Sequence, residues 1–501
     1  MLMLMKSTKN EKLNKVSLEA IIWIQFLILI VLLLFRFLYE SFVFQPDSLI
    51  YPFCCLFGVL TIWVFWSWST LTKSLFNPYL LFFLSAILFN GGNALLEIFH
   101  VNEDGIIGGL KESTYYYYYS SKNILETLLL VLIGLAAFHL GGLISLATFT
   151  VKSLKDKNFT KTRLLSKNTY KLGLRLFFIS LFPAIFVLRN SISVVLSSGY
   201  NSLYHQETGT GLSVVPSILA DFLVPASLFI LAGSKEKPRG RLLAAIVIFI
   251  YAITRFFLGQ RNQAVMPLIS FAWLWHKWIN PIPKLFLLST GSLITFIILP
   301  LIAITRNTAG QDRLSINFLL ESFSSIDNPV IASISEMGGS MYTVAYTLQL
   351  VPSERDFQMG TDYFYALFTI IPNIFGKRHP TIARGLAEHW LTEQVDPYFA
   401  SSGGSYGFSF IAEAYLNFGW FGAPIALGVI GFLFTKLTLW AVKSSNPAKM
   451  AMVASFVSFF LFYPRAESAL VVRGLVWYSL IPYLSVYVLN RSSSKEIAKL
   501  D

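Results

Sequence analysis

The sequence predicts an all-α integral membrane protein with about twelve transmembrane helices and one large extracytoplasmic loop. Of its 501 residues, 55% are hydrophobic and only 13% are charged, whereas about a quarter of the residues in a soluble protein are charged. The apolar segments run for about twenty residues without strand-like alternation, which favours membrane-spanning helices and excludes a transmembrane barrel. One long segment, 305–409, separates the ninth apolar segment from the tenth.

The predicted spans divide the chain into four parts. Residues 1–304 hold the first nine spans, 305–409 the large loop with short or interfacial helices, 410–490 the last three spans, and 491–501 a tail. Each span is close to the length that a helix needs to cross the hydrocarbon core. The expected spans are 20–39, 49–68, 79–99, 124–148, 172–189, 213–232, 242–258, 262–279, 285–304, 410–435, 448–463 and 471–489.

Basic residues in the short loops predict the orientation of the chain. Lysines and arginines concentrate in the two terminal tails and in the loops 149–171 and 233–241. With twelve spans these segments share one side of the membrane, and the positive-inside rule makes that side cytoplasmic. We therefore expect both termini in the cytoplasm. The same pattern explains the formal charge of +12 without nucleic-acid binding, because the charges flank apolar helices.

Motifs for several kinds of chemistry are absent from the sequence. The chain has no GxxxxGK[ST] loop, which argues against an ATP-driven pump, and no cytoplasmic segment long enough to bind a nucleotide sugar. It has no HExxH motif and no His/Cys cluster, and Cys54 and Cys55 are adjacent within an apolar run. We expect no cofactor and no catalytic metal. The substrate must arrive already activated and react in the membrane or at its outer face.

Aromatic and apolar runs on the outer side have two interpretations. Tyr115–Tyr119 fits an aromatic belt at the headgroup level or a platform that stacks sugar rings. Within the large loop, 331–350 has helical spacing, and the run YFYALFTIIPNIF (363–375) is too short to span and too apolar to be solvated. We expect this second run to form a helix that lies at the interface or dips toward the bundle.

Four arginines lie at the outer ends of predicted spans: Arg261, Arg306, Arg465 and Arg473. Each one alone fits a side chain that extends to the membrane interface. The positive-inside rule makes arginines on the outer side less expected, so four of them favour a shared anionic ligand. Phosphate is the natural candidate, because the guanidinium fork donates two parallel hydrogen bonds and stays charged.

Glu413 is the most unusual residue in the chain, since it lies at the apolar start of the tenth span with Tyr415 and Asn417 close by. A carboxylate inside a membrane helix predicts a function by default. The other interpretation is that it neutralises one of the outer arginines. Glu336 and Glu467 are weaker cases of the same kind.

A dense polar group follows in the sequence GKRHPTIARGLAEHW of the large loop. If residues 381–391 form one helix, Arg384 and Glu388 are four apart and can pair. His379 stands before a proline and therefore lies at a bend. It is either a general base or an ordinary surface histidine.

These residues lie in stretches that resemble the O-antigen repeat-unit polymerase (Wzy) family of bacterial envelope polysaccharide assembly. The resemblance covers the chain from about the fifth span onward, and its most specific part is GFSFIAEAYLNFGWFG followed by the arginine pair Arg465 and Arg473. The matching stretches are GQR (259–261), EMGGSMYTVAYTLQLVP (336–352), IIPNIFGKRHP ending at Pro380, GFSFIAEAYLNFGWFG (407–422) and PRAESALVVRGLVW (464–477).

The resemblance implies a membrane glycosyltransferase of the GT-C type in the bacterial cytoplasmic (inner) membrane. In that family a growing glycan moves en bloc from undecaprenyl diphosphate onto the sugar of a lipid-linked repeat unit. It also implies membrane lipid, a chain-length regulator and a flippase as partners. The roles expected here are diphosphate binding by Arg261, Arg306, Arg465 and Arg473, catalysis by Glu413 with His379 as second choice, and sugar binding by Ser409, Tyr415, Asn417 and Glu336.

Three other functions remain open at the level of sequence. An O-antigen ligase-like transferase would have a similar layout. A lipid-linked oligosaccharide flippase can also have about twelve spans, but it is expected to show two related halves and no large outer loop. A structural protein of the envelope would leave Glu413 and the outer arginines unexplained.

Overall fold

The computed structural model describes residues 2–39, 45–103, 105–107, 119–149, 159–203, 211–306, 315–373 and 379–497. Within these ranges the chain forms helices and no strand. Eleven helical segments there are long and apolar enough to cross a membrane, which confirms the all-α membrane fold. They are Ser17–Tyr39, Pro46–Thr72, Pro78–Ile98, Ser121–Phe149, Arg163–Ser198, Gly211–Gly233, Pro238–Phe257, Lys284–Thr305, Phe410–Val442, Pro447–Arg465 and Ser468–Arg491.

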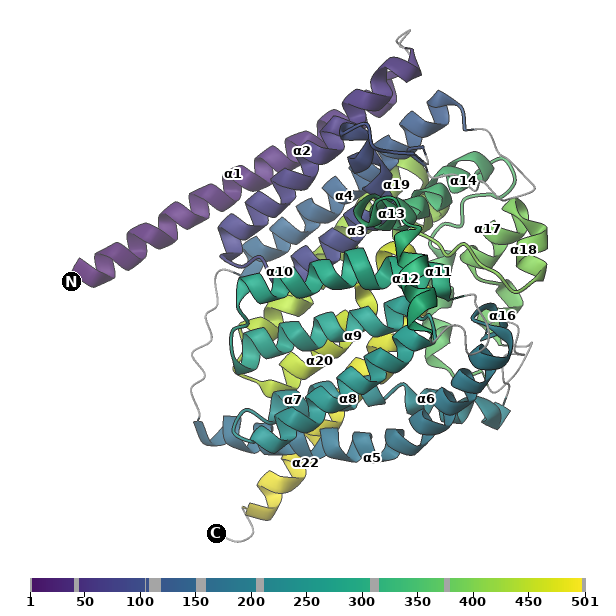
Figure 1. Ribbon diagram of the computed structural model, residues 1–501. Coiled ribbons are helices and arrows are strands. Elements are labelled where there is room, and N and C mark those ends of the chain that lie inside the picture. The colour runs from purple at the N-terminus through teal and green to yellow at the C-terminus, as the bar shows by residue number, and fades with distance from the viewer. Residues whose placement is uncertain are drawn as a thin grey trace.

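The expected span 262–279 is a helix in the structure but is not among these eleven. It consists of α9 (Arg261–Leu274) and a π-helical turn (Trp275–Ile279). Polar residues at both ends, such as Gln263 and Lys277, make it less apolar than its neighbours. It nevertheless packs against α8 (Pro238–Phe257) and α20 (Pro447–Phe460) inside the bundle, as Figure 1 shows.

The remaining long helices complete the bundle of Figure 1. They are α1 (Leu2–Tyr39), α2 (Pro46–Thr72), α3 (Pro78–Ile98), α4 (Ser121–Phe149), α5 (Phe159–Ser198), α6 (Val215–Ala220) with α7 (Leu223–Gly233), α10 (Lys284–Leu293) with α11 (Leu299–Thr305), α19 (Phe410–Val442) and α22 (Ile481–Ile497).

The centre of the fold is the contact between α4 and α19. Glycines allow the two backbones to approach closely, as small residues do between membrane helices. A Cβ atom on Gly141 would lie 1.9 Å from the carbonyl oxygen of Gly428, and one on Gly431 would lie 2.2 Å from that of Phe138. The contact therefore fixes where the start of α19 lies.

Gly419 interrupts α19 shortly after this start. Its φ of +61° and ψ of −163° are open to glycine and strained for other residues. At this break, carbonyl groups of the preceding turn lose their partners within the helix, and backbone amides after α14 donate hydrogen bonds to them instead. The amides of Gln358 and Met359 donate to the carbonyls of Leu416 and Asn417 at 3.0 and 2.9 Å. Irregular backbone inside a membrane protein requires this kind of cover.

The segment between the two membrane parts folds into short helices that gather at one end of the bundle, at the right of Figure 1. α1 begins and α22 ends at the opposite end. The short helices are α12 (Ile316–Ser324), α13 (Pro329–Gly338), α14 (Tyr342–Leu350), α15 (Thr361–Ala366), α16 (Pro380–Arg384), α17 (Ala387–Val395) and α18 (Pro397–Ser401).

Two details of this segment differ from the sequence expectations. Residues 381–391 do not form the one helix that a pairing of Arg384 with Glu388 requires, because Gly385 adopts a φ of +80° between α16 and α17. Arg384 consequently pairs with Asp362 at 2.7 Å instead of Glu388. The run 363–375 forms α15 and a 3-10 turn to Ile370, and residues 374 and 375 lie outside the described ranges.

The tyrosine run stays an open prediction. Tyr115–Tyr118 lie outside the described residues. Tyr119 is described, and its ring centre lies 5.3 Å from that of Tyr346 on α14.

Replacing Gly431 by alanine tests the central contact, because the new Cβ would meet the backbone of Phe138, which cannot rotate away. Overpacking of this kind costs about 1–3 kcal/mol, so we expect a lower midpoint of thermal unfolding in detergent. Gly428→Ala is the matched control, since a Cβ there meets Ala137 at 3.4 Å, an ordinary contact. Equal midpoints for the two variants would contradict the close approach of α4 and α19.

Candidate active site

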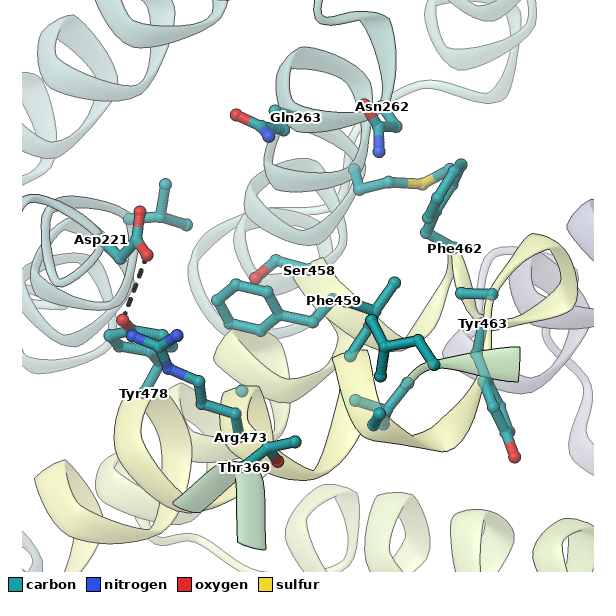
Figure 2. Close-up of a pocket in the computed structure, with 18 of the residues that line it drawn as sticks. Asp221, Asn262, Gln263, Thr369, Ser458, Phe459, Phe462, Tyr463, Arg473 and Tyr478 are labelled. Atoms are coloured by element: carbon teal, nitrogen blue, oxygen red, sulfur yellow. Dashed lines mark hydrogen bonds between the residues drawn. The ribbon is translucent and has the colours of Figure 1, made fainter. Parts of the chain in front are cut away.

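A cavity of about 500 Å³ lies where the short-helix segment meets the bundle. Its walls come from α7, α8, α9, α20, the turn after α20, α21 (Ser468–Arg473) and residues within 369–373 and 379–386. Figure 2 shows this cavity with its polar side chains on several elements. The polar lining residues are Asp221, Tyr251, Asn262, Gln263, Thr369, Asn373, His379, Thr381, Ser458, Tyr463, Arg473 and Tyr478.

Asp221 brings a carboxylate to the cavity. It lies between α6 and α7 and accepts a hydrogen bond of 3.1 Å from the hydroxyl of Tyr478, as Figure 2 shows. Arg255 and Arg473 both lie within electrostatic range of it. Sequence reasoning missed Asp221, although an acidic residue inside the apolar span 213–232 was the signal that could have found it.

Glu336 on α13 is the carboxylate on which three of the four predicted arginines converge. Arg261 at the start of α9 donates two hydrogen bonds to it, at 2.7 and 2.5 Å. Arg306 and Arg465 also act electrostatically on the same carboxylate. Partial burial alone would raise the pKa of Glu336, but the three arginines outweigh it and the pKa is lowered. We call Arg261, Arg306 and Arg465 the arginine cluster.

Two members of the arginine cluster have no ion pair with a carboxylate in the part of the chain that the structure describes. Arg306 directly follows α11, and its guanidinium lies 5.3 Å from the ring centre of Tyr200. Its buried Nε has no hydrogen-bond partner among the described residues. Burial and the nearby Arg261 lower the pKa of Arg306. Arg465 lies over the ring of Phe89 at 5.8 Å. The guanidinium groups of Arg306 and Arg465 could therefore bind an additional anion.

Arg473 lies apart from the cluster. It ends α21 and lines the cavity next to Tyr478 and Asp221 (Figure 2). The four predicted arginines thus divide into a group of three around Glu336 and one in the cavity wall. Residues next to Arg261 and Arg465, namely Asn262 and Ala466, also line the cavity, so the two places adjoin.

Glu413 joins the first turn of α19 to the start of α21. It is fully buried, and both carboxylate oxygens accept from the amide of Ser468 at 3.0 Å. The hydroxyls of Ser468 and Tyr463 also donate to it, the latter at 3.0 Å. It has no arginine partner within the described ranges and does not line the cavity. These contacts tie the start of α19 to the start of α21, and the catalytic role expected for Glu413 stays a prediction.

Three predicted sugar-binding residues are likewise buried and have protein partners. Ser409 donates to Oδ1 of Asn90 at 2.6 Å, and the hydroxyl of Tyr415 lies 3.4 Å from the carbonyl of Val351. Asn417 donates to Asp362 at 3.0 Å. None of the three lines the cavity, and the fourth, Glu336, is held by Arg261.

His379 is the predicted catalytic residue that lines the cavity. Its Nε2 lies 3.0 Å from the carbonyl oxygen of Ile371. Because a carbonyl only accepts, Nε2 carries the hydrogen in this contact. The neutral ring then presents Nδ1 as an acceptor, which is the arrangement that a general base needs.

Glu467, between α20 and α21, is a buried carboxyl group with one unused oxygen. Its Oε2 accepts from the amide of Ala387 at 3.0 Å and so caps α17, whereas Oε1 has no partner among the described residues. Burial raises the pKa of Glu467 well above its usual value, and Glu388 and Glu413 add to the effect.

The raised pKa of Glu467 makes the stability of the fold depend on pH. The folded state holds this proton at pH values where the unfolded state has lost it, so stability falls as pH rises from about 4.3 to the folded pKa. Glu467→Gln keeps a neutral group and removes that loss. We therefore compare the melting temperature of Glu467→Gln with that of the native protein at each pH. The difference, variant minus native, should become more positive as the pH rises from about 5 to about 8.

Glu393→Gln on the exposed side of α17 is the matched control and should give a difference that does not change with pH. A constant difference for Glu467→Gln across this range would show that Glu467 is not held in its neutral form. The measurement is thermal unfolding of the detergent-solubilised protein.

Comparison with known proteins identifies the family. The family model described as O-antigen polysaccharide polymerase Wzy matches residues 20–496, nearly the whole chain. No curated protein and no solved structure matches the chain. Within the described ranges, no group of three or more His, Cys, Asp or Glu residues is placed to hold a metal ion. The chain therefore belongs to the O-antigen polysaccharide polymerase Wzy family, whose members are multi-pass inner-membrane enzymes acting on lipid-linked oligosaccharide repeat units.

Proposed function

We propose that this polymerase moves a growing glycan en bloc from undecaprenyl diphosphate onto the sugar of a lipid-linked repeat unit, at the outer face of the cytoplasmic membrane. The observation that carries the proposal is the arginine cluster, in which three guanidinium groups surround a single carboxylate beside a cavity. A site with cationic groups to spare fits a substrate that carries two phosphates.

The arginine cluster would act on the diphosphate leaving group. As the bond between the sugar and the diphosphate breaks, negative charge develops on the phosphate oxygens. Guanidinium groups that are already in place stabilise this charge without reorganising. Arginine also suits phosphate better than lysine, because its planar fork donates two parallel hydrogen bonds.

The cavity would hold sugar residues next to the cluster. Its volume lies within the usual range for small-molecule sites. Its lining combines amides and hydroxyls, such as Asn262, Gln263 and Tyr478, with the aromatic rings of Phe459 and Phe462. Sugars present hydroxyl groups at their edges and C–H groups on their faces, so this mixture suits them. Arg473 and Asp221 supply charged hydrogen-bonding groups at the same place.

His379 would take the proton from the acceptor hydroxyl. In this step the acceptor oxygen forms a bond to the anomeric carbon, its proton moves to Nδ1 of His379, and the diphosphate leaves with the electron pair of the broken bond. Glu413 would support the step indirectly, because its contacts with Ser468 and Tyr463 hold the segment that carries Arg465 and Arg473. The transition state would have oxocarbenium character, by analogy with glycoside hydrolysis.

The proposed orientation puts the short helices outside the cell and both termini in the cytoplasm. The basic loops support this orientation through the positive-inside rule, and Figure 1 supports it because α1 begins and α22 ends away from the short helices. A GT-C-like layout, a chain-length regulator and a flippase as partners belong to the same proposal.

Single replacements of Arg306, Arg465 and His379 by alanine test this proposal. Removing a group that stabilises developing charge typically lowers the rate by about 10²–10³-fold. We therefore expect cells that make Arg306→Ala or Arg465→Ala to accumulate single repeat units and to lack long chains. We expect His379→Ala to shorten the chains. The measurement is the polysaccharide ladder on a gel, at matched protein levels.

Arg241→Ala in the first turn of α8 is the control and should leave the ladder unchanged. Full-length ladders from Arg306→Ala and Arg465→Ala would overturn the assignment of the arginine cluster. Long chains that form but are not attached to their final carrier would favour a ligase-like transferase.

A further inference from the structure

The contact between Arg261 and Glu336 occupies the arginine fork that the proposed function needs for phosphate. Arg261 donates to both carboxylate oxygens of Glu336, at 2.7 and 2.5 Å. A carboxylate and a phosphate offer a guanidinium the same pair of acceptor oxygens. A substrate diphosphate that binds Arg261 in this way must therefore displace Glu336.

We propose that Glu336 is an internal competitor of the diphosphate: it holds Arg261 in the resting enzyme, yields to the incoming lipid diphosphate, and returns to release the diphosphate product. This inference rests on the proposed function, since it assumes that the arginine cluster binds the diphosphate. It adds that Glu336 determines how tightly the cluster holds that ligand and how fast it lets the product go.

Exposure distinguishes Glu336 from the other acidic residues near the site. The side chain of Glu336 is 36% exposed, whereas Glu413 and Glu467 are 0% and 3% exposed. A displaced Glu336 carboxylate can reach water, so it keeps its charge without burial in apolar surroundings. Breaking a contact of Glu413 would instead leave a buried charge unpaired, which costs several kcal/mol. Of these three residues, Glu336 is thus the one that can exchange partners.

The location of Glu336 also favours exchange. It lies in the last turn of α13, whose backbone is held against α3 by a close approach of Gly338 to Asn93. Rotation of the Glu336 side chain is therefore sufficient, and the helix does not need to move. Once Glu336 has left, three arginines face the ligand with no bound carboxylate between them.

Competition of this kind has a measurable consequence. A ligand whose site is closed for part of the time binds with an apparent affinity reduced by that fraction. Removing the charge of Glu336 should leave the cluster open. Affinity for the diphosphate should then rise, and product release should slow. An ion pair that is only structural predicts the reverse, because its loss would disorder Arg261 and weaken binding.

The experiment measures binding of inorganic pyrophosphate to the full-length protein in detergent by titration calorimetry. We expect Glu336→Gln to bind pyrophosphate about tenfold more tightly than the native protein. Glu126→Gln is the matched control, because Glu126 also pairs with an arginine, Arg36, but lies on α4 between bundle helices. This control should bind like the native protein. In steady-state polymerisation, Glu336→Gln should lower KM and kcat together.

Two further variants keep every outcome informative. Glu336→Asp retains the charge on a shorter side chain and should tighten binding less than Glu336→Gln, which covers the case that the glutamine variant does not fold. Equal or weaker binding by both Glu336 variants would overturn the role of Glu336. If Arg465→Ala abolished pyrophosphate binding while the Glu336 variants bound no more tightly than the native protein, only the role of Glu336 would be wrong and the proposed function would stand. If neither Arg465→Ala nor the Glu336 variants changed binding, the diphosphate site itself would be wrong.

Discussion

The structure depends on a polar stripe at the start of α19. Ser409, Glu413 and Asn417 are four residues apart, so they lie along one face of the helix. Each is fully buried, and each contacts a different segment: Asn90 of α3, Ser468 of α21 and Asp362 of the short-helix region. Burial of these groups without partners would be costly, so each of the three needs its partner in the folded protein. One helical face thereby joins the bundle to the segment that covers it.

The stripe explains how charged groups from distant parts of the chain meet. Glu413 holds the turn between α20 and α21. This turn carries Arg465 and leads into α21, which ends at Arg473. Arg261 and Arg306 arrive from α9 and α11, and Glu336 on α13 gathers them with Arg465. The proposed stabilisation of a diphosphate leaving group depends on cationic groups that are already in place, and these contacts hold the arginines where the proposal needs them.

Hydropathy was sufficient to predict most of the fold. Runs of about twenty apolar residues predict membrane helices whatever their neighbours are, since length and burial decide the matter. The break at Gly419 was not predictable in this way, because a glycine inside an apolar run is also typical of an ordinary membrane helix. The separate helices α16 and α17 escaped prediction for a similar reason, since the positive φ of Gly385 depends on its tertiary surroundings.

The site was only partly predictable. The positive-inside rule was enough to single out the four arginines, but not to show that Arg473 lies apart from the other three. Asp221 was overlooked although it interrupts an apolar span. The partners of Glu413 are at Tyr463 and Ser468, about fifty residues away in the chain, and no local pattern points to them.

The three glutamates around the site differ in their unused bonding capacity, and this difference separates their roles. Glu413 is fully buried and accepts from three donor groups, so both of its oxygens have protein partners and it holds the start of α19 against α21. Glu467 is buried with one oxygen unpartnered among the described residues, so its neutral form is favoured. Glu336 is partly exposed, and its hydrogen bonds come from Arg261 alone among the described residues, so it remains charged and exchangeable. In the proposed exchange with a diphosphate ligand, the carboxylate has to leave the arginines and return to them, and among these three that condition selects Glu336.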